Sequence, residues 1–419
     1  MLESALQLYR SSAELPPAFD LERDNSRRIW LASYERRRAN SMSKKLIVCA
    51  DGTWNKVEKL QSGKHLSTNV AKFAAALCPT DVHGTAQLLC YLEGVGTHRG
   101  KWIRDGMLAL DISPNIPSVS KFLLRQAFQV LAALQQPRNI RSAYEFLVRY
   151  YEPGDEIWIF GFSRGAFTAR SLAGMIRSSG LLKVAHVDRI GDAMALYRDR
   201  YDDTAPDAPR TRVFRQTYAH EPNIKFIGVW DTVGSLGVPG VHLWLARLLR
   251  VDWQFHDTNL SRSVENAYHA LAIHEKRSDF KPTLWQKQQW PQADQQTLEQ
   301  VWFCGVHSDV GGGYVEEQVS DVALMWMIEK AKARGLAFRE DFLADQNWFH
   351  PDVEGKLHDS FDFPFSWLDS LRRKTGNREF QADGANTFES IHESVVKRFE
   401  KGEHNWTPSF LQALQKLMQ

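Results

Sequence analysis

The segment EIWIFGFSRGAFTARSLAGMI, residues 156–176, decides the fold class of this chain. Its first seven residues are almost all apolar, as in a strand that is buried on both faces, whereas the small residues that follow are typical of a tightly packed helix. The pentapeptide GFSRG at 161–165 joins the two and is a G-x-S-x-G motif. In a sharp strand-to-helix turn, this motif exposes its serine hydroxyl above a sheet. The pattern therefore makes Ser163 a candidate nucleophile.

The same alternation of strand and helix extends along most of the chain. Further apolar runs typical of buried strands are residues 46–50, 87–94, 224–230 and 301–306. Helical spacing is found in residues 69–77 and 140–151, and we also expect a helix over 266–277. Strands that are apolar along nearly their whole length and alternate with helices predict an α/β fold. We expect an α/β-hydrolase-like, mostly parallel central sheet with helices on both faces.

Changes in composition divide the chain into three parts. Residues 1–43 are polar and rich in arginine, so we expect a loosely ordered extension. Residues 44–335 form the expected catalytic domain, interrupted by insertions at about 99–138 and 236–255 that we interpret as cap or lid helices. The second insertion is aromatic and amphipathic, and the alternative for both is a lipid-facing surface. Residues 336–419 are expected to pack on the catalytic domain, with no role assigned.

Composition limits the partners and the compartment. The 52 basic and 50 acidic residues leave a formal net charge of +2, which gives no reason to expect nucleic acid as a partner. The four cysteines are widely spaced, so a reducing compartment is expected. The first residues lack the pattern of a signal peptide, and no apolar stretch reaches the ~18 residues of a membrane span. We expect a cytoplasmic protein where it is made, with any export by a non-classical route.

A nucleophilic serine needs a base, and the base needs an orienting acid. In α/β hydrolases these residues follow the chain order serine, acid, histidine. Asp231 directly follows the apolar run 224–230, and His307 directly follows the run 301–306. Because groups at the carboxyl ends of parallel strands meet at one edge of the sheet, we expect both residues to lie beside Ser163.

Other histidines and one other aspartate are candidates for the base and the acid. His269 and His274 are five residues apart, which does not place them on one helix face, so we interpret them as structural. His392 is the alternative base. Asp309, two residues after His307, is either a supporting partner of the site or an alternative acid.

An oxyanion hole needs two hydrogen-bond donors. The backbone N–H of Arg164 is the expected first donor, and Gly52 or Thr53, in the loop DGTWN, is expected to supply the second. A carboxylate at Asp51 would repel an oxyanion, so we expect it to hold this loop in place. A metal bound by Asp51 and Asp309 is a less favoured alternative, and we expect neither a metal nor another cofactor.

Four sequence blocks resemble one known family. They are DGTWN at 51–55, GFSRGAFTAR at 161–170, GVWDTVGSLG at 228–237 and GVHSDVGGGY at 305–314. Together they resemble the α/β-hydrolase domain of type VI secretion phospholipase effectors (Tle-like), a family that also includes uncharacterised stand-alone bacterial and fungal proteins. Smaller matches at 268–277, 282–285 and 390–398 extend the resemblance. It implies Ser163 as nucleophile, Asp231 as acid and His307 as base, and, for effectors, the hydrolysis of membrane phospholipids.

These observations predict a serine hydrolase that cleaves carboxylic esters through a Ser-His-Asp triad and an acyl-enzyme. We expect a phospholipase A-type lipase, with a soluble esterase or thioesterase as the first alternative. A non-catalytic binding module with the same fold is the alternative outside enzymes. The expected partners are a lipid or another ester, with peripheral membrane contact, and the resemblance leaves room for an immunity or secretion partner.

Overall fold

The computed structural model describes most of the expected catalytic domain and part of the remaining chain. The described residues are 28–31, 43–52, 60–61, 64–65, 67–94, 137–199, 202–233, 258–277, 280–360, 378–380, 386–403 and 406–418. Nearly all of the expected insertion at 99–138, and all of that at 236–255, lie outside these residues. The expected cap or lid helices are therefore not described.

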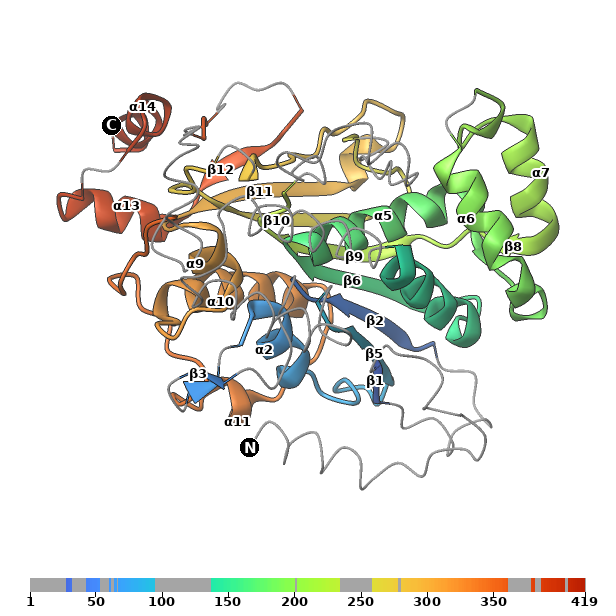
Figure 1. Ribbon diagram of the computed structural model, residues 1–419, viewed down its shortest axis with the longest axis horizontal. Coiled ribbons are helices and arrows are strands. Elements are labelled where there is room, and N and C mark those ends of the chain that lie inside the picture. Colours follow the sequence, from blue (N-terminus) through green and yellow to red (C-terminus); the bar gives the residue numbers. More distant parts are fainter. Residues whose placement is uncertain are drawn as a thin grey trace, which may run out of the picture.

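One eight-stranded sheet forms the centre of the molecule (Figure 1). In spatial order, its strands are β1 (Arg28–Leu31), β5 (Gln87–Leu92), β2 (Lys45–Ala50), β6 (Glu156–Phe162), β9 (Ile224–Trp230), β10 (Asn266–Ala272), β11 (Thr297–Phe303) and β12 (Glu389–Ile391). Every neighbouring pair is parallel except β1 and β5, which are antiparallel. The predicted α/β class and mostly parallel sheet are confirmed.

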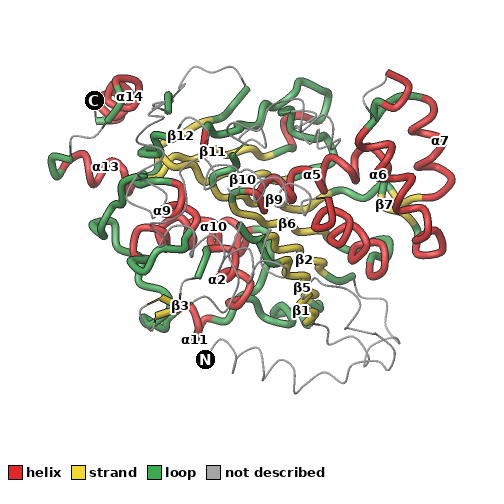
Figure 2. Tube along the Cα trace, in the orientation of Figure 1, coloured by secondary structure: helices red, strands yellow, loops and turns green. Residues whose placement is uncertain are grey.

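Helices pack on both faces of this sheet (Figure 2). They are the helix at 137–150, α2 (Asn69–Ala76), α5 (Arg164–Ser179), α6 (Ile190–Arg198), α7 (Pro209–Tyr218), α9 (His307–Gly311), α10 (Gln318–Ala333), α11 (Glu340–Leu343), α13 (Glu393–Glu400) and α14 (Pro408–Leu417). In β2, Leu46 and Val48 join the core under α5 and α6, whereas Ile47 and Cys49 join the core under α2 and α10. Alternate residues of one strand thus face opposite layers, which explains why β2 is apolar from its second residue to its last.

A buried ion cluster connects two helices on one face of the sheet. Lys72 of α2 is fully buried, and its Nζ lies 2.7 Å from a carboxylate oxygen of Glu317 and 2.8 Å from one of Asp321. Asp321 belongs to α10. Because an unpaired buried charge is costly, the three side chains are held together and fix α2 against α10.

The prediction of a helix over residues 266–277 is wrong. Residues 266–272 form strand β10, which is buried along its whole length between β9 and β11. The polar side chain of His269, in this strand, is satisfied inside the protein. His269 Nε2 accepts a hydrogen bond from the Thr232 N–H at 3.0 Å, and its Nδ1 lies 3.2 Å from Gln300 Oε1. Burial lowers the pKa of His269 to about 3, so it is neutral and structural, as the sequence predicted.

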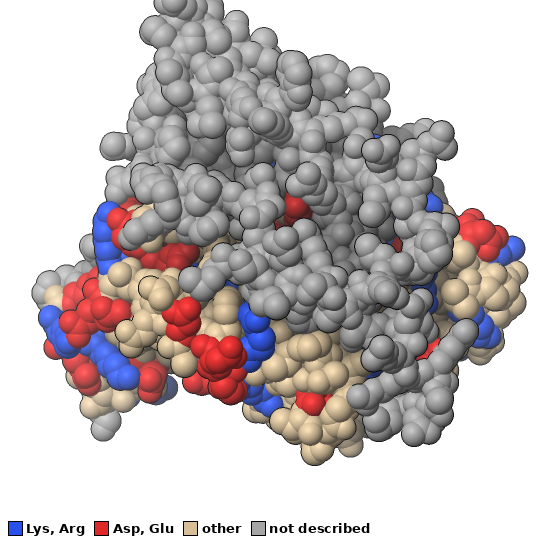
Figure 3. Space-filling model, turned by 90° about the horizontal axis from the view of Figure 1, so that it is seen from below, with Lys and Arg blue, Asp and Glu red and all other residues tan. Residues whose placement is uncertain are grey.

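Surface charge and helix hydropathy are considered for the described residues. In the face shown in Figure 3, acidic and basic side chains are interspersed over the described atoms. In the described part of the chain, no helix is both long enough and apolar enough to cross a membrane.

Candidate active site

Three of the predicted residues lie at the carboxyl ends of parallel strands. Ser163 follows β6, Asp231 follows β9, and His307 begins the short helix α9 after β11, where the sequence predicted a loop. Because parallel strands all end at the same edge, the side chains converge there although they are far apart in the sequence.

Ser163 lies in a sharp turn between β6 and α5. Its φ of 56° and ψ of −120° are unusual for a residue with a side chain, and its N–H donates to the Trp230 carbonyl at 3.1 Å. A Cβ atom at Gly161 would lie 2.4 Å from the Gly165 carbonyl oxygen, and one at Gly165 would lie 2.0 Å from the Ala50 carbonyl oxygen. Both glycines are therefore required for the close packing of β2, β6 and α5 around the turn.

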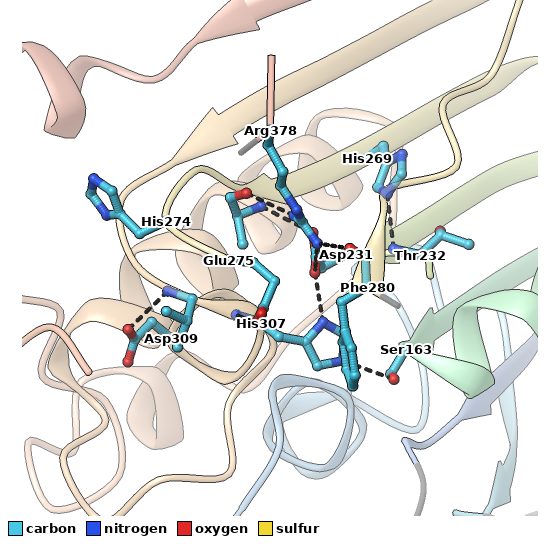
Figure 4. A network of polar contacts seen from close by, with 12 residues as sticks. Ser163, Asp231, Thr232, His269, His274, Glu275, Phe280, His307, Asp309 and Arg378 are labelled. Atoms are coloured by element: carbon cyan, nitrogen blue, oxygen red, sulfur yellow. Dashed lines mark hydrogen bonds and ion pairs between the residues drawn. The ribbon is translucent and has the colours of Figure 1, made fainter. Parts of the chain in front are cut away.

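A continuous hydrogen-bonded chain links the three side chains (Figure 4). Ser163 Oγ lies 2.8 Å from His307 Nε2, and His307 Nδ1 lies 2.6 Å from Asp231 Oδ2. All three residues are buried. With Asp231 ionised, a neutral His307 donates its Nδ1–H to the carboxylate and accepts from the serine hydroxyl at Nε2. This tautomer is the one that a general base needs.

The electrostatics favour that protonation state. Burial lowers the pKa of His307 below its ordinary value, which keeps the imidazole neutral at neutral pH. Burial alone would raise the pKa of Asp231, but the ion pair with Arg378 and the hydrogen bond from His307 hold it well below its usual range. The site thus combines an ionised acid with an uncharged base.

Aromatic rings and a buried acid hold His307 in place. The Phe162 ring lies 4.7 Å and the Phe280 ring 5.0 Å from the imidazole, centre to centre. The N–H of His307 donates to a carboxylate oxygen of Glu275 at 3.3 Å. Although burial opposes it, the bidentate pair with Arg277 lowers the pKa of Glu275 to about 2, so this carboxylate is ionised.

The predicted oxyanion loop is held by Asp51. Its Oδ1 accepts from the Gly52 N–H at 2.6 Å, and its Oδ2 accepts from the Thr68 hydroxyl at 2.9 Å and from the Tyr91 hydroxyl. Burial raises the pKa of Asp51 to about 6. Since its N–H is bonded to Asp51, Gly52 must break this bond before it can bind an oxyanion. Thr53 lies outside the described residues.

Asp309 holds the other end of the site. Its Oδ2 accepts from the Val306 N–H at 3.0 Å, and its Oδ1 lies 2.6 Å from His358 Nδ1. These contacts fix the start of α9, which carries His307. Asp51 and Asp309, considered above as a metal pair, each bind their own partners. Within the described ranges, no group of three or more histidine, cysteine, aspartate or glutamate residues is suited to bind a metal.

The remaining candidate histidines bind elsewhere. His274 Nδ1 accepts from the Gly305 N–H at 2.9 Å, a structural contact. His392 Nδ1 lies 2.9 Å from Ser394 Oγ, and its ring stacks on Phe303 with the centres 4.4 Å apart. The histidine hydrogen-bonded to the Ser163 hydroxyl is therefore His307 and not the alternative His392.

Arg378 is a residue of this site that the sequence did not reveal. It is 4% exposed, and its guanidinium contacts both carboxylate oxygens of Asp231. It lies in a C-terminal segment without regular spacing, more than two hundred residues after Ser163. Nothing in a single sequence distinguishes this arginine from the many on the surface.

The chain is similar in sequence to one described protein family and to a yeast protein. Residues 44–330 match the family described as the type VI secretion system (T6SS) phospholipase effector Tle1-like catalytic domain. The chain is 32% identical over 250 residues to the uncharacterized protein YEL023C of Saccharomyces cerevisiae, covering 58% of this chain and 33% of that protein. It therefore spans only about a third of this relative's length.

Two solved structures show lower similarity. One is a crystal structure of an uncharacterized protein from Pseudomonas aeruginosa, with a TM-score of 0.39 and 18% identity, covering 74% of this chain and 49% of that one. The other is the Tle1 effector bound to the VgrG spike of the type 6 secretion system, with a TM-score of 0.30 and 18% identity. It covers 65% of this chain and 51% of that one.

Proposed function

Because the chain belongs to the family of type VI secretion phospholipase effector Tle1-like catalytic domains, we propose that it is a serine ester hydrolase, specifically a phospholipase A-type lipase. One observation supports the serine mechanism in addition to the family match. It is the hydrogen-bonded chain from Ser163 through His307 to Asp231, with distances of 2.8 and 2.6 Å. This is the arrangement that activates a serine hydroxyl.

The proposed reaction has two steps. His307 Nε2 removes the hydroxyl proton as Ser163 Oγ attacks the ester carbonyl, and Asp231 stabilises the resulting imidazolium. The imidazolium then protonates the leaving alkoxide, so the C–O bond breaks and an acyl-serine remains. Water, deprotonated by the same histidine, attacks this acyl-serine, and the carboxylic acid leaves as the proton returns to Ser163.

The negative charge on the carbonyl oxygen needs donors. We assign the first to the N–H of Arg164, which begins α5, where the helix dipole also favours an anion. The second comes from the loop after β2, through Gly52 or Thr53. With Gly52 as the donor, release of its N–H from Asp51 is part of substrate binding.

Fluorophosphonate labelling tests the activated serine. Purified wild type is expected to be labelled, Ser163→Ala is expected not to be labelled, and Ser178→Ala, a change later in the same helix, is expected to behave as wild type. Hydrolysis of phospholipid vesicles should fall by several orders of magnitude in Ser163→Ala. A Ser163→Ala protein that is still labelled or still active would refute the mechanism.

The substrate class is tested by binding. We propose membrane adsorption together with a lipid substrate, so wild type should co-sediment with phospholipid vesicles and cleave them faster than a short-chain soluble ester. Turnover of the soluble ester alone, without vesicle binding, would favour the esterase alternative. A secretion or immunity partner belongs to the same proposal.

A further inference from the structure

The acid of the triad has a second partner, which comes from the C-terminal segment. Arg378 Nη1 lies 2.6 Å from Asp231 Oδ1, and its Nη2 lies 3.0 Å from Asp231 Oδ2. Asp231 is fully buried, and Arg378 is almost so. The two parallel contacts match the planar fork of a guanidinium to a carboxylate, which a lysine cannot reproduce. Figure 4 shows Arg378, Asp231 and His307 in succession.

The same guanidinium also binds two backbone carbonyls near the base. Nη1 donates to the Ala272 carbonyl at 2.7 Å, at the end of β10, and Nη2 donates to the Phe280 carbonyl at 2.6 Å. The Phe280 ring packs edge-on against the His307 imidazole. One side chain therefore fixes the acid and the segment that packs on the base.

Contacts with α14 hold Arg378 in this position. The Thr407 hydroxyl donates to the Arg378 carbonyl at 3.4 Å, and the Phe380 N–H donates to Ser409 Oγ at 3.1 Å. The Phe380 ring packs on Phe410 of α14. Phe410 is fully buried and packs in turn on Trp302 of β11. The C-terminal helix is thus connected to the sheet and, through Arg378, to the site.

We propose that Arg378 is a positioning residue of this hydrolase, which orients Asp231 and keeps it ionised, so that the working site extends past residue 330, where the family match ends, into the C-terminal segment. The inference rests on the proposed function of the same site. A bidentate clamp on the acid restricts the rotation of the carboxylate, and this fixes the His307 imidazole toward Ser163.

The charge of Arg378 has a consequence that a purely structural residue would not have. The charged groups around His307 are Asp231 after β9, Glu275 and Arg277 after β10, and Arg378. Removing one positive charge from this group stabilises the protonated imidazole, so the pKa of His307 must rise. The acid limb of the pH profile of kcat/KM should then move to higher pH.

The test compares three variants of the full chain. In Arg378→Gln, we expect kcat/KM to fall about 10- to 100-fold, the scale seen when the supporting partner of an active-site group is removed. Its acid limb should move up by roughly one pH unit. Arg378→Lys keeps the charge and should restore the acid limb but only part of kcat. The matched control is Arg215→Gln, another buried arginine that binds a carboxylate and two backbone carbonyls, in α7.

A second readout is independent of turnover. In protein labelled with 13C-histidine, the His307 resonance, assigned with a His307→Asn variant, is titrated in wild type and in Arg378→Gln. An unchanged His307 pKa would overturn the proposal, as would Arg378→Gln activity within threefold of wild type. If Arg378→Gln does not fold, the proposal is tested with Arg378→Lys instead. Full activity of Arg378→Lys would refute the proposed role of the bidentate contact. A raised His307 pKa in a chain that cleaves no ester would refute only the proposed function.

Discussion

Replacing Ser163 by glycine should stabilise the protein relative to replacing it by alanine, although both variants lose the proposed nucleophile. The backbone at Ser163, with φ 56° and ψ −120°, lies in a region that only glycine occupies without strain. Such strain costs about 1–3 kcal/mol, whereas glycine loses about 0.4–1 kcal/mol through the greater freedom of its unfolded chain. The central values leave about 1 kcal/mol in favour of glycine.

Calorimetry of the two variants measures this difference. For a chain of this size, 1 kcal/mol corresponds to a rise in Tm of about 2 °C. Ser178 provides the control pair, because it is buried in the regular part of α5. There alanine should be the more stable residue by about 1 kcal/mol. The turn at Ser163 is not strained if the Tm of Ser163→Gly is equal to or below that of Ser163→Ala while the control pair behaves as expected.

Three further predictions follow from the core and the site. Gly165→Ala should lower Tm by many degrees, because the added Cβ would lie 2.0 Å from the Ala50 carbonyl oxygen. The control is Gly174→Ala, whose Cβ meets only a tyrosine ring at 3.1 Å and which should be tolerated. Thermal unfolding compares the two variants. Lys72→Ala should cost about 3–5 kcal/mol in denaturant unfolding at pH 7, since the carboxylates of Glu317 and Asp321 stay buried without a cation. The cost should be smaller at pH 5, because burial already raises the pKa of Glu317; an equal loss at both pH values would contradict this. In wild type, kcat/KM should fall as pH drops through the lowered pKa of His307, so a midpoint above 6.5 would contradict the assigned base.

The parts of the fold that the sequence predicted are those with a strong local pattern. The strand-turn-helix around Ser163 has two glycines that no other residue can replace, β9 is apolar except for Lys225, and β11 ends in the apolar residues Val301, Trp302 and Phe303. The rule that parallel strands end at one edge then brought Asp231 and His307 to the serine without any long-range information.

The parts that were missed depend on contacts between distant segments. The sequence predicts a helix where β10 lies, but the polar side chain of His269 is satisfied by Thr232 and Gln300 inside the sheet. Residues 28–31 form a strand only by pairing with β5, and Arg378 acquires a role only through Asp231. Such roles come from tertiary contacts, which local propensity does not contain.

The origin of Arg378 in the C-terminal segment has a consequence for the order of events during synthesis. The ribosome makes Ser163, Asp231 and His307 before Arg378, and at about 5–20 residues per second the arginine follows the histidine by on the order of 4–14 s. During that interval Asp231 lacks its clamp, so the nascent chain carries the three residues of the proposed triad but not a fully oriented site. With the proposed lipase activity, a cell that makes this protein is thereby spared most of that activity until the segment that carries Arg378 has folded onto the rest.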